Sequence, residues 1–358
     1  MRIYTNLDLL RAVAVLCVVL DHSLKFFGHR ILFGVDMQWL GRLGVMFFFV
    51  HTCTVLMMSL DRSYGKFSTG KFLGNFYLRR IFRIYPLSIF AIAIVLIFSI
   101  PSAEIPDAFT FVQVVPTKTE LLSNLLLVQN LHGRSIIGVL WSLPFEVQMY
   151  VLLPFIFLLL ARRGKLAWLL TIWTAVWIVS YLARPRNLLF LAHFLPGVIA
   201  FVLIRKVKQP RMPAWIWPLF IGSLIFLFLA ISPSFVTGGI VCLVLALSLP
   251  YFHDLNYRPL NMVTHNIAKY SYGVYLSHMF CLWFAFIHLR LQPVALRSLV
   301  LGGLLIGVPV LLFHLLEDPC IRAGSSLANH LFASKRESRR ESNIDLRTEE
   351  LEETASGL

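Results

Sequence analysis

Apolar residues form long runs along this chain, separated by short polar stretches. A helix needs roughly 20 mostly apolar residues to cross a bilayer. Runs of about that length occupy 7–27, 41–60, 84–100, 137–161, 166–183, 188–204, 214–231, 236–252, 272–290 and 296–316. The pattern predicts an all-α polytopic membrane protein with about ten transmembrane helices. The leucine-rich stretch 119–131 is too short to span, and we expect it to lie at the membrane interface.

Composition supports this fold class. Hydrophobic residues make up 58% of the chain and charged residues only 14%, whereas soluble domains have roughly 45–50% apolar and about 25% charged residues. So little charge excludes a soluble enzyme, a secreted disulfide scaffold and a disordered chain. The 5 cysteines are far apart and mostly lie inside apolar runs, so they are interpreted as small hydrophobic residues.

The net charge of +14 is compatible with nucleic acid binding, with anionic lipid or with membrane topology. If the N-terminus is cytoplasmic, 22 of the 32 basic residues fall in cytoplasmic segments and 9 in external ones. This bias follows the positive-inside rule and predicts that both termini are cytoplasmic. Topology therefore explains the charge without a nucleic acid partner. We divide the chain into a membrane domain, 1–334, and a polar tail, 335–358, which we expect to be disordered.

Ionisable residues lie inside the first apolar run, and Arg11 and His22 are the two whose spacing is informative. Arg11 and His22 are eleven positions apart, so on a helix they share one face and lie about 16 Å apart along its axis. Ionisable groups in a bilayer are costly and are functional by default. Asp8 can pair with Arg11, since it lies three positions before it. The alternative is that Arg11 snorkels to the interface and His22 is a capped polar residue near the surface.

Three arginines, Arg79, Arg80 and Arg83, come just before the third apolar run. Arginine makes bidentate contacts with phosphates, so this cluster is suited to a phosphorylated ligand at the cytoplasmic mouth. An anchor for lipid headgroups is the competing interpretation.

The fourth run opens with Ser142, Glu146 and Tyr150, which share a helix face because they are four residues apart. Glu146 is the only acid in its run, and a buried carboxylate needs an Arg, His or hydroxyl partner unless it is protonated. A purely structural ion pair or hydrogen bond and a role in the functional site are therefore both open for Glu146.

A similar polar stripe, Ser271, Tyr275 and His278, lies in the ninth run. Glu317-Asp318-Pro319 follows the last run, and we expect these residues to end its helix and to pair with a cytoplasmic arginine.

Taken together and in this order, the clusters resemble the acyltransferase-3 family of polytopic membrane acyltransferases, over residues 3–320. The resemblance depends on Leu7-Asp8-x-x-Arg11 with the R-x10-H spacing, Arg80-x-x-Arg83-x-x-Pro86, Trp141-Ser142-Leu143 with Glu146, Ser271-Tyr272 with Tyr275 and His278, and Glu317-x-Pro319. One feature departs from the family: His51-Thr52 stands where a Ser-Gly pair usually follows the Phe-Phe run. This places a further ionisable group in the membrane.

The resemblance implies transfer of an acyl group, commonly acetyl, from cytoplasmic acyl-coenzyme A to a hydroxyl of a sugar-containing cell-envelope acceptor. It also implies a multi-pass protein of the inner (plasma) membrane, in contact with lipids and with no metal. A polytopic transporter or a lipid-sugar flippase is the alternative, because intramembrane Arg, His and Glu would suit it equally.

Roles for the site residues follow as hypotheses. His22 is the general base, because its ordinary pKa suits neutral pH. Arg11 binds a phosphate or polarises the thioester, and Glu146 orients His22 or binds the acceptor. An acyl-histidine intermediate remains open. The coenzyme is assigned to Arg79, Arg80, Arg83 and Trp141, and the acceptor to Ser142, Ser271, Tyr275, His278 and His51. With phosphates bound inside and the base outside, the pantetheine arm must reach through the bundle.

Overall fold

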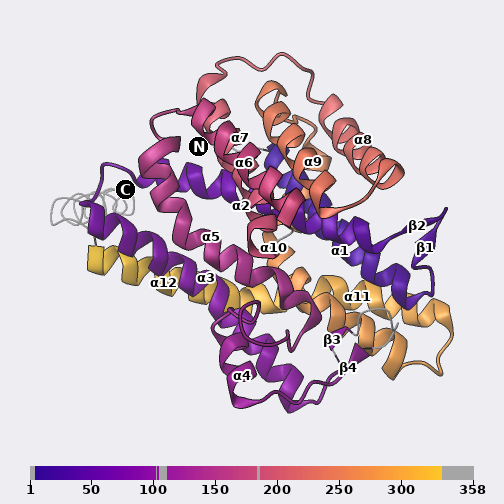
Figure 1. Ribbon diagram of the computed structural model, residues 1–358. Coiled ribbons are helices and arrows are strands. Elements are labelled where there is room, and N and C mark those ends of the chain that lie inside the picture. The colour runs from indigo at the N-terminus through magenta and orange to yellow at the C-terminus, as the bar shows by residue number, and fades with distance from the viewer. Residues whose placement is uncertain (1–4, 102, 105–110, 184–185, 333–358) are drawn as a thin grey trace, which may run out of the picture.

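The computed structural model describes residues 5–101, 103–104, 111–183 and 186–332, and most of them are helical (Figure 1). The helices are α1 Thr5–Phe26, α2 Gln38–Ser63, α3 Thr69–Ile97, α4 Lys118–Leu125, α5 Leu143–Ile156, α6 Leu166–Ala183, α7 Arg186–Lys206, α8 Ile216–Ile231, α9 Phe235–Ser248, α10 Arg258–Trp283, α11 Val294–Leu312 and α12 Asp318–Phe332. Single turns of 3-10 helix occupy Gly138–Ser142 and Leu249–Tyr251, and π turns occupy Phe157–Ala161, Phe284–His288 and Phe313–Glu317.

Two short antiparallel hairpins complete the described structure. Strand β1 (Ile31–Leu32) pairs with β2 (Val35–Asp36) between α1 and α2, and β3 (Ala103–Glu104) pairs with β4 (Phe111–Val112) after α3. The predicted tail, 335–358, lies outside the described residues.

The prediction of an all-α membrane protein is confirmed. Five helices among the described residues are long and apolar enough to cross a membrane: Gln38–Ser63, Thr69–Ile97, Gly138–Ala161, Leu166–Ala183 and Val294–Phe332. Each of the ten predicted apolar ranges overlaps a helix. Helices α8 and α9 are shorter, so the number of crossings and the side on which the termini lie stay predictions.

The centre of the bundle is built on α2, which packs against α1 and α7, while α1 also packs against α10. Glycines allow this close approach. A Cβ at Gly44 would lie 2.5 Å from the Ala14 carbonyl oxygen, and one at Gly197 would lie 2.6 Å from Cys53 Cβ. Small residues of this kind let the backbones of membrane helices approach closely.

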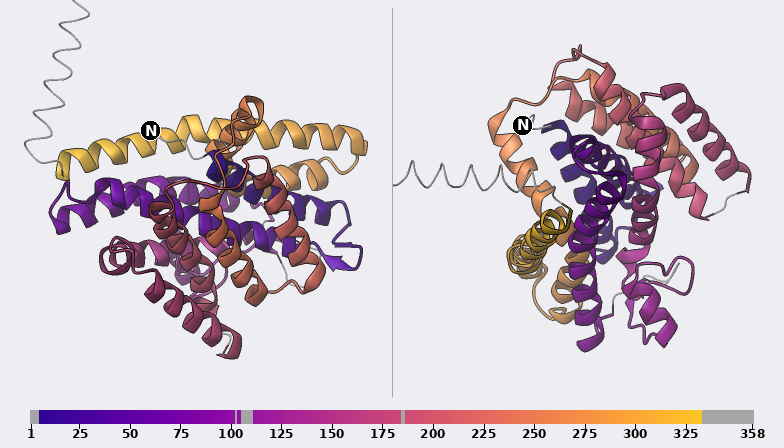
Figure 2. Two further views of the ribbon diagram at one scale, coloured as in Figure 1. Left: turned by 90° about the horizontal axis from the view of Figure 1, so that it is seen from above. Right: turned by 90° about the vertical axis from the view of Figure 1, so that its left-hand side faces the viewer.

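The sequence predicts that the helix of the last apolar run ends at Glu317-Asp318-Pro319. This prediction is wrong, because the helix continues past these residues. Helix α11, the π turn and α12 form one continuous element of 39 residues, which runs along the whole length of the bundle (Figure 2). Pro319 has no N–H to donate and crowds the preceding turn, but it follows directly on a π turn, whose wider backbone accommodates it. The α12 half packs along α3, where Gly324 lies against the Phe82 side chain.

The stretch 119–131 forms the short helix α4 and then a loop. A capping box begins α4: the Thr117 side chain accepts from the Glu120 N–H, and Glu120 accepts from the Thr117 N–H. This backbone hydrogen bond lowers the pKa of Glu120. Asn124 binds the following loop through the Arg134 carbonyl and the Ile136 N–H, so the segment forms a compact cap beside the bundle.

Candidate active site

Two cavities meet at helix α2. We call them the arginine cavity, about 280 Å³, and the histidine cavity, about 600 Å³, after the side chains that line them. Val45 and Tyr275 line both. Along α2 the histidine cavity extends from Gln38 to Val45, about 10 Å, and the arginine cavity from Val45 to Arg62, about 26 Å. Together they follow α2 almost from end to end.

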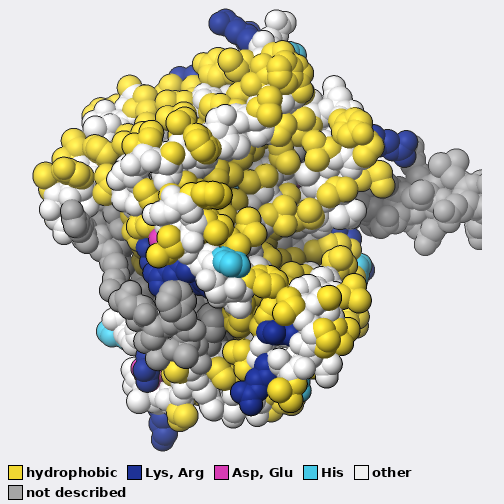
Figure 3. Space-filling model, turned by 90° about the vertical axis from the view of Figure 1, so that its right-hand side faces the viewer, with side chains coloured by type: hydrophobic (Ala, Val, Ile, Leu, Met, Phe, Trp, Pro, Cys, Tyr) yellow, Lys and Arg dark blue, Asp and Glu magenta, His cyan; other side chains and the backbone are white. Residues whose placement is uncertain are grey.

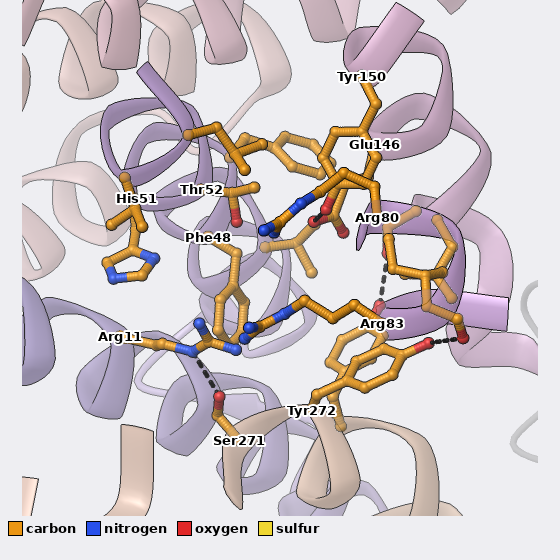
Figure 4. Close-up of a pocket in the computed structure, with 18 of the residues that line it drawn as sticks. Arg11, Phe48, His51, Thr52, Arg80, Arg83, Glu146, Tyr150, Ser271 and Tyr272 are labelled. Atoms are coloured by element: carbon orange, nitrogen blue, oxygen red, sulfur yellow. Dashed lines mark hydrogen bonds between the residues drawn. The ribbon is translucent and has the colours of Figure 1, made fainter. Parts of the chain in front are cut away.

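The arginine cavity collects cations from three helices. Its lining includes Arg11 of α1, Arg62 of α2 and Arg80 and Arg83 of α3, and Glu146 is the one carboxylate among the described lining residues. Figure 4 shows Arg11, Arg80 and Arg83 reaching into the same space. Four guanidinium groups against one carboxylate favour a polyanionic ligand.

Hydrogen bonds fix part of this lining. Arg11 donates from Nε to Ser271 Oγ over 2.6 Å, and Ser271 donates in turn to the Ala268 carbonyl. The Nε of Arg80 is buried and has no hydrogen-bond partner among the described residues. A buried donor without a partner carries a desolvation cost that a bound ligand can remove.

Glu146 is also held within this cavity. The Tyr150 hydroxyl donates to Glu146 Oε1 over 2.5 Å, one helical turn away (Figure 4). One turn earlier, Ser142 Oγ lies 2.7 Å from the Tyr275 hydroxyl. The polar stripe at four-residue spacing therefore faces the cavity, as the sequence indicated.

The histidine cavity takes its name from His22, whose ring contacts that of His278. Nδ1 of His22 lies 2.9 Å from the Val18 carbonyl oxygen, and Nδ1 of His278 lies 3.0 Å from that of Val274. Because a carbonyl oxygen only accepts, we assign the proton of each neutral ring to Nδ1. His22 Nδ1 then also donates to His278 Nε2, 3.3 Å away.

This assignment leaves Nε2 of His22 unprotonated. Of the two histidines, His22 is the one that lines the cavity, so the lone pair of its Nε2 can accept a proton there. His278 is fully buried and lines neither cavity. Its contact with His22 fixes the tautomer of that ring.

Comparison with known families decides what class of protein this is. The family described as an acyltransferase domain matches residues 4–314 of the chain. The protein belongs to this acyltransferase-3 family. A search of curated proteins and a search of solved structures give no match. With its long apolar helices, the chain is thus a multi-pass membrane acyltransferase.

Most of the predicted site residues of this acyltransferase line one of the two cavities. They are not divided between the cavities as the predicted coenzyme and acceptor sets were. Residues on the arginine cavity are Arg11, His51, Arg80, Arg83, Ser142, Glu146, Ser271 and Tyr275. Those on the histidine cavity are His22, Trp141 and Tyr275. Trp141 thus lies with His22 and not with the arginines, whereas His51, Ser142 and Ser271 lie on the arginine side.

Several expected pairings differ in the structure. His22 is contacted by His278 and not by Glu146. Asp8 binds His265 over 2.9 Å, while Arg11 binds Ser271. These partners come from α10, whose packing against α1 is not visible in the local sequence.

Arg79 faces away from the arginine cavity. It donates to Asn75 on its own helix and to Ser325 and Asn329 of α12. Neighbouring residues on a helix point about 100° apart, so Arg79 and Arg80 cannot face the same side. Arg79 joins α3 to α12.

Sequence reasoning missed several cavity residues. Arg62 and Tyr272 line the arginine cavity. The histidine cavity is also lined by Lys25, Arg30, Gln38, Arg42, Gln129, Asn130 and Arg134. They come from the end of α1, the start of α2 and the segments that follow each of α1 and α4, and their convergence depends on how these segments pack over the bundle.

Proposed function

We propose that the protein is an O-acyltransferase that moves an acyl group, acetyl in the simplest case, from acyl-coenzyme A to a hydroxyl of a sugar-containing cell-envelope acceptor. The observation that carries the proposal is the pair of cavities that meet at Val45 and Tyr275. One presents phosphate-binding cations and the other an unprotonated histidine nitrogen. In a direct transfer, two such cavities bind donor and acceptor separately and bring the reacting groups together where the cavities meet.

The donor occupies the arginine cavity in this proposal. Arg62, Arg80 and Arg83 bind the phosphates of the coenzyme, because guanidinium forks match phosphate oxygens. The pantetheine arm runs along α2 toward Val45 and brings the thioester to the partition between the cavities. Arg11, held by Ser271, lies along this path and can polarise the thioester carbonyl.

The acceptor occupies the histidine cavity. His22 Nε2 removes the proton from the acceptor hydroxyl, whose oxygen attacks the thioester carbonyl carbon. The carbon–sulfur bond breaks, and the thiolate of the coenzyme takes the proton from the His22 imidazolium. His278 is a positioning residue, since its Nε2 accepts from His22 Nδ1 and stabilises the charged ring.

The membrane arrangement follows the same logic. We propose about ten crossings, both termini on the cytoplasmic side and a place in the inner (plasma) membrane. The charge bias supports this orientation. It puts the arginine cavity on the side where acyl-coenzyme A is made, and the histidine cavity on the envelope side.

The test is a membrane assay with labelled acetyl-coenzyme A and host envelope fractions. His22→Ala is expected to lose about 10²–10⁴-fold in rate, as removal of a general base does. His29→Ala is the matched control, because His29 is exposed in the loop after α1. Undiminished transfer by His22→Ala at equal expression would contradict the assignment of the base.

A further inference from the structure

We propose that the histidine cavity recognises an acidic saccharide, in which a carboxylate or phosphate lies close to the accepting hydroxyl. The inference rests on the proposed function and names its acceptor class. It is carried by three features of this cavity: a buried amide oxygen without a partner, an aromatic wall and an excess of cations.

The buried amide belongs to Gln129, which is 2% exposed. Its Nε2 donates to the Leu140 carbonyl over 3.0 Å, while its Oε1 has no hydrogen-bond partner among the described residues. An acceptor buried without a donor is costly. Because Gln129 lines the cavity, a ligand hydroxyl is suited to supply the missing donor.

The aromatic wall is continuous. The ring centroid of Phe190 lies 5.5 Å from that of Trp141, 4.1 Å from that of Phe145 and 5.3 Å from that of Phe235, and all four residues line the cavity. Aromatic side chains with a few directed polar groups are typical of small-molecule sites. The apolar C–H face of a sugar ring packs on such a surface while its hydroxyls reach the amides.

The cations distinguish an acidic sugar from a neutral one. Lys25, Arg30, Arg42 and Arg134 line the cavity, with Asp21 as its carboxylate. Three described carboxylates, Asp21, Asp36 and Glu120, lie beside these four cations, so the group keeps a positive charge by count. Lys25 lies 3.8 Å from Asp21, Arg30 lies 2.8 Å from Asp36, and Arg134 lies 3.4 Å from Glu120.

Arg42 is held between two aromatic rings. Its guanidinium carbon lies 4.7 Å from the Trp39 ring centroid and 5.4 Å from that of Phe235. Stacking fixes the plane of the guanidinium and favours bidentate recognition of a carboxylate or phosphate. Figure 3 views the end of the molecule that carries β1 and β2, a largely hydrophobic face on which Lys and Arg side chains stand in several small groups.

The donor's phosphates do not explain these cations. Arg42 and Arg62 are twenty residues apart on α2, which is about 30 Å along the helix. The cations near Arg62 and those near Arg42 therefore lie at opposite ends of the two joined cavities. The anion bound near Arg42 belongs to the acceptor.

The experiment measures binding and transfer separately on the full chain in detergent. The probes are oligogalacturonate, the same oligosaccharide after reduction of its carboxyl groups, galactose 1-phosphate, and vesicles of phosphatidylglycerol. We expect oligogalacturonate to bind at least tenfold more tightly than its reduced form. Galactose 1-phosphate tests whether a phosphate replaces the carboxylate.

Arg42→Gln and Arg134→Gln are each expected to weaken oligogalacturonate binding about tenfold, because a charge-assisted hydrogen bond is lost. Neither should change binding of the reduced form. Arg163→Gln is the matched control, since Arg163 is exposed and lines neither cavity. Arg134 is itself 67% exposed, so its substitution leaves the fold intact.

Equal affinity for the acidic and the reduced oligosaccharide would overturn the inference, as would displacement of both by phosphatidylglycerol vesicles alone. Selective binding without acyl transfer would support the inference and contradict the proposed function instead. Transfer from acetyl-coenzyme A to neutral saccharides only would support the proposed function and contradict the inference of an acidic acceptor.

Discussion

The Tyr275 hydroxyl lies 2.7 Å from Ser142 Oγ, at the point where the arginine and histidine cavities meet. It also donates to the Val139 carbonyl over 2.7 Å. Since a single hydroxyl has one proton, Ser142 is the donor in the first contact. Tyr275 thus joins α10 to the turn before α5 and forms the partition between the cavities with Val45.

Removal of that hydroxyl should loosen the partition. Tyr275→Phe leaves Ser142 and the Val139 carbonyl without a buried partner, which costs about 1–3 kcal/mol of stability. We also expect more acyl-coenzyme A to be hydrolysed by water for each acyl group transferred. The measurement is the ratio of free coenzyme to acylated acceptor. Tyr270→Phe is the control, as its hydroxyl faces His314 at an exposed contact.

His278→Ala should lower kcat and leave KM for acyl-coenzyme A unchanged, because His278 touches His22, the proposed base, and does not line the arginine cavity. Loss of the partner that orients a metal-binding histidine commonly costs 10–100-fold, and we expect a loss of the same order here. His278→Gln retains a polar side chain and should recover part of the rate. An equal change in KM and kcat for both variants would indicate general damage to the bundle.

Arg79 and Arg80 allow a direct comparison of neighbouring residues. Arg80→Gln is expected to raise KM for acyl-coenzyme A about tenfold with the melting temperature unchanged, since Arg80 lines the cavity. Arg79→Gln removes the contacts with Ser325 and Asn329, so it should lower the melting temperature and leave KM as it is. Steady-state kinetics and thermal unfolding in detergent distinguish the two. The reversed outcome would mean that α3 is rotated relative to the structure.

Gly197→Ala should destabilise the bundle by about 1–3 kcal/mol, the usual cost of overpacking. The added methyl group would lie against the Val50 carbonyl and 2.6 Å from Cys53 Cβ. Gly302→Ala is the matched control on α11, because nothing lies within 4 Å of its Cβ position. Thermal unfolding of both variants in detergent measures the difference, and equal melting temperatures would contradict the close packing of α2 and α7.

Asp36 makes the loop between α1 and α2 sensitive to acid. Burial by itself would raise the pKa of Asp36, but hydrogen bonds from Arg30 and from the Gln38 N–H lower it overall. A carboxyl group whose pKa is lower in the folded chain stabilises the fold, and the effect is fully present at a pH above the pKa of the unfolded chain, about 3.9. The stabilisation is lost as the pH falls through the pKa of the folded chain. The melting temperature of Asp36→Asn should therefore be below that of the wild type near neutral pH, and the gap should close at low pH. A difference in melting temperature that does not change with pH would mean that the charge of the Asp36 carboxylate contributes nothing to stability.

Much of the fold follows from periodicity and charge. Apolar runs of membrane length predict helices whatever their neighbours are, because a backbone in lipid must satisfy its own hydrogen bonds. The same local geometry placed Ser142, Glu146 and Tyr150 on one face. The continuation of the last helix past Glu317 was not predictable, since Pro319 normally marks an end and the π turn that accommodates it leaves no local signal.

The chain alone therefore determined the helices, the family resemblance and the spacing of Arg11 and His22 along one helix face. Only the tertiary structure decided which residues meet. His278 and not Glu146 partners His22, Trp141 lines the histidine cavity, and Arg79 turns away from the arginine cavity. The physical reason is that local spacing fixes direction about one helix axis, whereas partners depend on how several axes pack together.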